Sequence, residues 1–119
     1  MRFYTSVFKD AGLIAIRRYG ANEAGAEGTV LQAVFSLLGQ EFMCIDSSVE
    51  HGFTFNPAIS FYIIADDEAA IGEYFGKLSQ GGKVLMPLAA YPFSRLFGWV
   101  QDRFGVSWQL SRDAFAGGE

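Results

Sequence analysis

The single histidine and the single cysteine of this sequence are the first candidates for acid–base, nucleophilic or metal chemistry. His51 is the only histidine, and a neutral imidazole could serve as a base or as a metal ligand. Its place in an acidic connection next to Gly52 favours an ordinary loop histidine. Cys44 is the only cysteine, and a lone thiol without a base beside it is more often a small buried hydrophobe than a nucleophile. The acidic run at 66–68 stands where a helix is expected to begin, so capping explains it better than catalysis.

Polar and aromatic side chains near the carboxyl end form the second candidate group. Ser107 and Gln109 share one face of a predicted strand, and Trp108 lies on the other. A surface that faces a ligand and a surface that faces solvent explain this alternation about equally well. The aromatic residues nearby could line a pocket for a flat or apolar ligand, although filling the core is their commoner role. The candidate cavity residues are Ser107, Gln109, Tyr91, Phe93, Trp99 and Cys44.

The elements that must position these side chains are expected over residues 58–111. The apolar run at 58–65 predicts a buried strand. A helix is expected over 67–79, with Ile71, Tyr74, Phe75 and Leu78 on one face and glycines at its end. Strands are expected over 83–86, 97–102 and 106–111, and the segment 91–93 lies in a loop suited to a pocket lid.

The first part of the chain predicts a similar order of elements. Residues 2–8 read as the end of a helix and 13–19 as a strand, and a flexible acidic loop follows at 20–28. The runs 29–38 and 40–46 predict a hairpin, with Leu31, Ala33, Phe35 and Leu37 on one face. We expect a single domain, 1–119, with a truncated first module at 1–46, a linker at 47–57, a second module at 58–111 and a tail at 112–119.

The amino-acid composition limits which partners the protein can bind and in which cellular compartment it is expected. A chain of 119 residues with 50% hydrophobic and 16% aromatic residues can bury one sizeable core but hardly two independent ones. The formal net charge of -4 disfavours nucleic acid and anionic membrane surfaces. No intrachain disulfide, secretion signal or membrane-spanning run is expected, so we predict a cytoplasmic protein.

Four collinear segments carry a family resemblance. They are Phe3-Tyr4-x-Ser6-x-Phe8, the run GQEFM at 39–43, the run PAISF at 57–61, and WVQDRFGVSWQL at 99–110. They resemble the PhnB-like family, often labelled 3-demethylubiquinone-9 3-methyltransferase domains, of the vicinal-oxygen-chelate superfamily. That superfamily also holds glyoxalase I, bleomycin-resistance proteins and extradiol dioxygenases. The resemblance implies an α+β fold of two βαβββ modules, of which the first lacks its opening strand.

The same resemblance sets expectations for a metal site. Relatives usually take ligands from His, Glu or Gln on the first and last strands of their modules. Here Gln109 stands where metal-dependent relatives carry glutamate, and Ile59 and Ser60 stand where a histidine would be expected. A neutral amide is a weaker ligand for a hard cation than a carboxylate. A divalent metal is therefore possible but not expected, and the weak candidate ligands are His51, Gln109 and Glu41.

The resemblance implies a protein that binds or transforms a small, partly apolar metabolite in a cavity formed by curved sheets. The alternative is a non-catalytic dimer that sequesters a drug or metabolite. Quinone methyl transfer is disfavoured, because the sequence has no glycine-rich strand-to-helix turn for a methyl donor. The catalytic residues, and whether the protein is an enzyme, stay open. We predict a homodimer, because a missing opening strand leaves a sheet edge unpaired. Side chains among Phe3, Tyr4, Val7 and Phe8 are expected at its interface.

Overall fold

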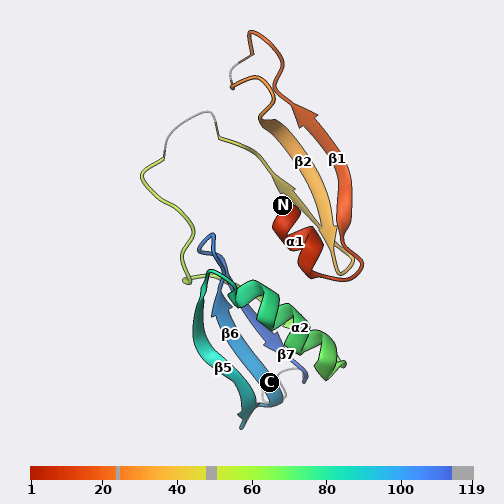
Figure 1. Cartoon of the computed structure of the whole chain (residues 1–119), viewed down its shortest axis with the longest axis vertical. Helices are drawn as coiled ribbons and strands as arrows, with labels where there is room; N and C mark the ends of the chain where they lie inside the picture. Colours follow the sequence, from red (N-terminus) through yellow and green to blue (C-terminus); the bar gives the residue numbers. More distant parts are fainter. Residues whose placement is uncertain (24, 48–50, 114–119) are drawn as a thin grey trace, which may run out of the picture. The chain divides into compact units, whose positions relative to one another are not determined.

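The computed structural model describes residues 1–23, 25–47 and 51–113, which fall into two compact units, Met1–Gly52 and Phe53–Glu119 (Figure 1). The predicted linker and tail therefore lie partly outside the described residues. The α+β architecture predicted from the sequence is confirmed. In chain order the elements are α1 (Arg2–Val7), β1 (Gly12–Arg18), β2 (Val30–Leu37), β3 (Gln40–Cys44), β4 (Ser60–Ile64), α2 (Glu68–Ser79), β5 (Lys83–Tyr91), β6 (Ser94–Gln101) and β7 (Ser107–Ser111).

The first unit is an antiparallel sheet of three strands in the order β1-β2-β3, together with the short helix α1. Ala33, Phe35 and Leu37 alternate as buried residues along β2, as the hydrophobic pattern predicts. The turn between β2 and β3 places Leu38 and Gly39 at positive φ, at 52° and 82°. Among the described residues no strand pairs with the outer side of β3.

The second unit is a four-stranded sheet in the order β4-β7-β6-β5, with α2 packed on one face (Figure 1). The strand β4 pairs parallel with β7, and the other pairs are antiparallel. The order helix, strand, strand, strand therefore occurs twice in the chain, and β4 is the strand that the second unit has in addition. This matches the prediction of two modules, of which the first lacks its opening strand.

Helix α2 begins and ends where the sequence predicts. The side chain of Asp67 accepts a hydrogen bond from the Ala69 N–H at 2.9 Å, and Glu68 adds negative charge to the first turn. The acidic run is thus a cap, as expected. The buried face of α2 includes Ile71, Tyr74, Phe75 and Leu78, the residues expected from their spacing.

Two strand predictions were wrong in part. The run at 58–65 is the edge strand β4 rather than a buried one, and Tyr62 and Ile64 on it are 43% and 52% exposed. Its apolar content misled the prediction because, in the part of the chain that the structure describes, β4 pairs with β7 alone. The segment 91–93 is not a loop: β5 continues to Tyr91 and β6 starts at Ser94, which leaves a two-residue turn. The strand predicted over 83–86 is also longer, because β5 continues through Pro87, which lies within an irregularity of the β5–β6 register where proline is tolerated.

No helix in the described part of the chain is long and apolar enough to cross a membrane.

Candidate functional site

The sheet of the second unit has one face covered by α2 and an opposite face, which we call the open face. Gly98 on β6 identifies the covered face, because a Cβ added there would lie 2.5 Å from Phe75 Cε2 on α2. Val100 shares that face and is fully buried. Side chains alternate along a strand, so Phe97, Trp99 and Gln101 of β6 belong to the open face.

A row of four side chains crosses the middle of the open face, one from each strand. Met86 of β5 pairs with Trp99 of β6, Trp99 pairs with Gln109 of β7, and Gln109 pairs with Tyr62 of β4. Directly opposed residues in neighbouring strands have side chains close enough to touch. We call these four residues the mixed row, because it combines two flat rings, a thioether and one amide. It brings the predicted candidates Trp99 and Gln109 together.

A second row lies toward one end of the open face and is polar. It consists of Ser60, Ser107, Gln101 and Lys83, again one residue from each strand. Ser107 is fully buried, and its hydroxyl donates to the Ile59 carbonyl at 3.0 Å and contacts the Ser60 hydroxyl. These bonds tie β4 to β7. Ser107, a candidate cavity residue, therefore has a structural role. The alternation of polar residues in the sequence could not distinguish this role from ligand binding.

A third row lies beyond the mixed row on the other side and centres on Phe97, which is 3% exposed. Tyr91 and Phe93 meet the Phe97 ring edge-on, at centroid distances of 5.7 and 4.8 Å, and stack on each other at 5.6 Å. The Tyr91 hydroxyl donates to the Pro87 carbonyl at 2.7 Å. Tyr91 and Phe93 thus form an aromatic cluster at the β5–β6 turn, rather than a separate lid loop.

The turn between β6 and β7 is held by the buried carboxylate of Asp102. One oxygen accepts the N–H groups of Phe104 and Val106 at 2.8 and 3.2 Å, and the other accepts the indole N–H of Trp108 at 2.9 Å. Asp102 is 3% exposed, so these donors are needed to offset the burial of its charge. Trp108, on the covered face, is therefore a fully satisfied core residue.

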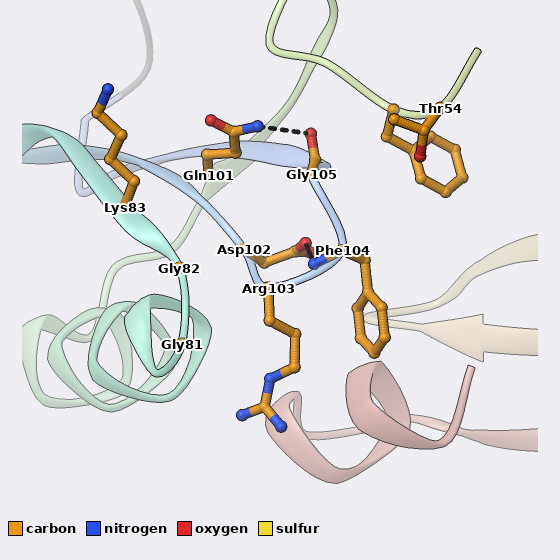
Figure 2. Close-up of a pocket in the computed structure, with 10 residues that line it drawn as sticks. Thr54, Gly81, Gly82, Lys83, Gln101, Asp102, Arg103, Phe104 and Gly105 are labelled. Atoms are coloured by element: carbon orange, nitrogen blue, oxygen red, sulfur yellow. Dashed lines mark hydrogen bonds between the residues drawn. The ribbon is translucent and has the colours of Figure 1, made fainter. Parts of the chain in front are cut away.

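A hollow of about 440 Å³ adjoins the polar row (Figure 2). Lys83 and Gln101 reach it from the sheet, and Arg103 and Gly105 line it from the β6–β7 turn. Figure 2 shows the ends of Lys83 and Arg103 pointing in different directions, so the two cations do not converge on one anion. A second hollow, of about 370 Å³, is lined mostly by apolar side chains of residues 54–61 and by Val106.

The structure separates the candidate metal ligands. His51 is exposed in a loop, with Nε2 3.0 Å from the Ser47 hydroxyl, and Glu41 lies on β3 of the first unit. Gln109 has Trp99 and Tyr62 as its row neighbours in the second unit. Among the described residues no three His, Cys, Asp or Glu side chains gather as a metal site. Amide, indole and phenol groups are poor ligands for a divalent cation, so the mixed row does not fit a resident metal ion.

Two further groups stand apart from the rows. Cys44 ends β3 in the first unit, half-buried opposite Ala33, and it is not part of a disulfide. Asp113 follows the end of β7, and its carboxylate lies 2.6 Å from the guanidinium of Arg95 on β6. Hydrogen bonds from the Arg95 side chain and backbone hold the pKa of Asp113 well below its usual range, and the same pairing raises the pKa of Arg95.

Tyr62 and Met86 are members of the mixed row that reasoning from the sequence missed. Tyr62 was hidden in a run taken as uniformly buried, and Met86 was taken as the last residue of its strand. The alternation of Ser60, Tyr62 and Ile64 could have indicated one face of β4, but its parallel partner β7 is distant in sequence.

Comparison with known proteins agrees with this architecture. The family model described as 3-demethylubiquinone-9 3-methyltransferase matches residues 1–111. The PhnB protein from Bacillus cereus is 54% identical, and the match covers 95% of this chain and 88% of that chain with a TM-score of 0.89. None of the curated proteins matches this chain.

More distant structures extend the similarity. A protein from Pseudomonas aeruginosa is 25% identical, with 86% of this chain and 78% of that chain covered and a TM-score of 0.73. A glyoxylase/bleomycin resistance protein/dioxygenase domain from Frankia sp. is 14% identical, with 95% and 85% covered and a TM-score of 0.66. At that identity the likeness is one of fold, and it assigns the glyoxalase/bleomycin-resistance fold to this chain.

Proposed function

This chain belongs to the family described as 3-demethylubiquinone-9 3-methyltransferase, and from that premise we propose that it binds a small, partly apolar metabolite on the open face of its second unit. The observation that carries the proposal is the mixed row of Tyr62, Gln109, Trp99 and Met86. It places two rings and one amide on the sheet face that α2 leaves uncovered. Binding sites for small molecules have this composition: a mostly apolar surface with a few polar groups that fix orientation.

The chemistry of the three rows favours binding over turnover. Within residues 51–113 the rows contain no Asp, Glu, His or Cys side chain, so the amine of Lys83 and the phenols of Tyr62 and Tyr91 are the main groups there that could move a proton. This supports the second candidate function, sequestration of a metabolite or drug without conversion. For the same reason we do not propose methyl transfer as the activity.

We also propose that the protein acts as a homodimer in the cytosol, where a lone thiol such as Cys44 stays reduced. Large apolar side chains are exposed on strands of both units, and the outer side of β3 is unpaired among the described residues. Val7 and Phe8, at the end of α1, are only 4% and 5% exposed, so the interface we propose uses β1 and β3 rather than these two residues. The exposed apolar residues of that region are Leu13, Ile14, Ile16, Met43 and Ile45.

The binding proposal can be tested with a set of small aromatic and aliphatic carbonyl compounds, alcohols and acids, screened by thermal shift. Compounds that stabilise the wild type should lose their effect in Gln109→Ala and Tyr62→Ala. The matched control is Glu73→Ala, which changes an exposed residue of α2. Compounds that stabilise all four proteins equally would contradict a site on the open face.

Turnover and sequestration can then be separated with the same compounds. Each stabilising compound is incubated with an equal amount of protein and recovered by chromatography. Quantitative recovery of unchanged compound supports sequestration. A new product that grows with time, at more than one equivalent per chain, supports an enzyme.

A further inference from the structure

The two tryptophans of the chain differ in one respect that bears on the ligand. The indole N–H of Trp108 donates to Asp102 at 2.9 Å. The indole nitrogen of Trp99 is buried and has no hydrogen-bond partner among the described residues. Buried polar groups are nearly always paired in folded proteins, so an unpaired donor on a candidate binding surface calls for a partner from outside the chain.

The neighbours of Trp99 limit what that partner can be. Met86 on one side is apolar and flexible, and it can move to admit a ligand. Gln109 on the other side brings an amide whose NH₂ group is a second donor. A ligand that accepts from these groups needs an acceptor atom attached to an apolar body that can lie against the rings of Trp99 and Tyr62.

Charge decides between a neutral and an anionic acceptor. The chain has a formal net charge of -4, and the mixed row contains no cation. Lys83 belongs to the polar row and reaches the hollow at that end of the sheet. A carboxylate placed at Trp99 would lose its hydration without an opposite charge beside it, whereas a carbonyl oxygen would not incur that cost.

We infer that the ligand is a neutral, flat carbonyl compound whose oxygen accepts the hydrogen bond of Trp99 Nε1–H. This inference rests on the proposed function, because it names the class of molecule bound at the same site. A bound carbonyl oxygen would give the buried Trp99 N–H the partner that it lacks among the described residues. Its hydrogen bond should therefore contribute more binding free energy than a hydrogen bond to an exposed group. We expect a carbonyl compound to bind roughly fivefold to a hundredfold tighter than the same compound without the oxygen.

The test uses acetophenone and ethylbenzene, which share a ring and differ by a carbonyl in place of a methylene. Full-length protein labelled with ¹⁵N-tryptophan gives two indole N–H signals, one of which disappears in Trp99→Phe and is thereby assigned. Acetophenone should bind more tightly and move the Trp99 signal downfield, with little change at Trp108. In Trp99→Phe the two compounds should bind equally. Trp108→Phe is the matched control and should keep the preference for acetophenone.

The outcomes separate the inference from the proposed function. If both compounds bind the wild type equally, or if the preference survives in Trp99→Phe, the inference is wrong and the site stands. If neither compound binds up to its solubility limit, both the site and the inference are overturned. The wild-type indole spectrum gives this answer even if one of the variants folds poorly.

Discussion

At the scale of single residues, the main contrast is between two tryptophans on opposite faces of one sheet. Replacing either indole with a phenyl ring shortens the side chain, and Trp108 is more deeply buried than Trp99. The hydrogen bond that is lost differs as well. Trp108→Phe leaves the buried Asp102 carboxylate with one donor fewer, whereas Trp99→Phe removes a donor for which residues 1–23, 25–47 and 51–113 provide no partner. We expect Trp108→Phe to lower the free energy of unfolding by about 1–3 kcal/mol more than Trp99→Phe does.

Urea denaturation of the two variants beside the wild type measures this difference. Equal losses of stability, or a larger loss in Trp99→Phe, would mean that Trp99 Nε1 has a partner within the folded protein.

The pair formed by Arg95 and Asp113 predicts a local pH dependence. The folded-state pKa of Asp113 is lowered, so the pair's stabilising effect is fully present above the ordinary aspartate pKa of about 3.9. It is lost as the pH falls below that value toward the depressed pKa. A carboxyl NMR titration should find Asp113 still ionised at about pH 3, and Arg95→Gln should move its titration toward the ordinary range, because only the bond from the backbone N–H of residue 95 is then kept. Titration of wild-type Asp113 near pH 4 would contradict the pairing.

The metal content is also decided by individual side chains. The amide of Gln109 and the hydroxyl of Ser60 are weak ligands, and we expect less than one divalent ion per chain after dialysis. Elemental analysis of the purified protein checks this. One tightly held zinc, nickel or manganese ion per chain would show the expectation to be wrong, and variants of His51, Gln109 and Glu41 would then locate it.

At the scale of elements, the contact between α2 and β6 is the point where packing is tightest. Phe75 is 9% exposed, and its ring occupies the space that a side chain at position 98 would need. We expect Phe75→Ala to cost about 3–5 kcal/mol of stability, as for other buried aromatic truncations. Glu73→Ala on the exposed side of the same helix is the control and should change stability little.

The same contact makes a prediction about Gly98. In the wild type, Gly98→Ala should cost about 1–3 kcal/mol, because the added methyl group meets the Phe75 ring. In a Phe75→Ala background the same change should cost less, since the ring is gone and only the contact with Leu88 Cδ1 at 3.0 Å remains. Thermal unfolding of the four proteins gives the coupling, and additive losses would contradict the contact.

Elements with short-range signals were predictable, and those that depend on distant partners were not. The cap at Asp67 and the spacing of Ile71, Phe75 and Leu78 located α2 correctly, because both signals lie within the helix itself. The exposure of β4 was missed, because it depends on pairing with β7 rather than on the composition of 60–64. For the candidate site, alternation alone could put Ser107 and Gln109 on one face. It could not show that the Ser107 hydroxyl is hydrogen-bonded to the backbone just before β4, or that Tyr62 is the fourth residue of the mixed row.

At the scale of the whole molecule, exposed apolar strands predict self-association. We expect light scattering to give the mass of a dimer at micromolar concentration. Met43 lies on β3 and is 60% exposed, and a lysine there should hinder strand pairing at that edge. Met43→Lys should therefore shift the protein toward monomer, whereas Gln80→Lys, which adds the same charge at the end of α2, should not. A stable wild-type monomer would remove the case for a dimer.

The parallel pairing of β4 with β7 has a consequence for synthesis on the ribosome. Ser60 and its partner Ser107 are 47 residues apart, and every other strand of the second unit lies between them. At about 5–20 residues per second, β4 waits roughly 2–9 seconds for β7 to be made. During that interval Phe61, Tyr62 and Ile64 have neither a sheet neighbour nor a finished core. A chain that ends before β7 would expose β4 as an unpaired apolar strand, so truncated forms of the second unit should aggregate more readily than the whole chain.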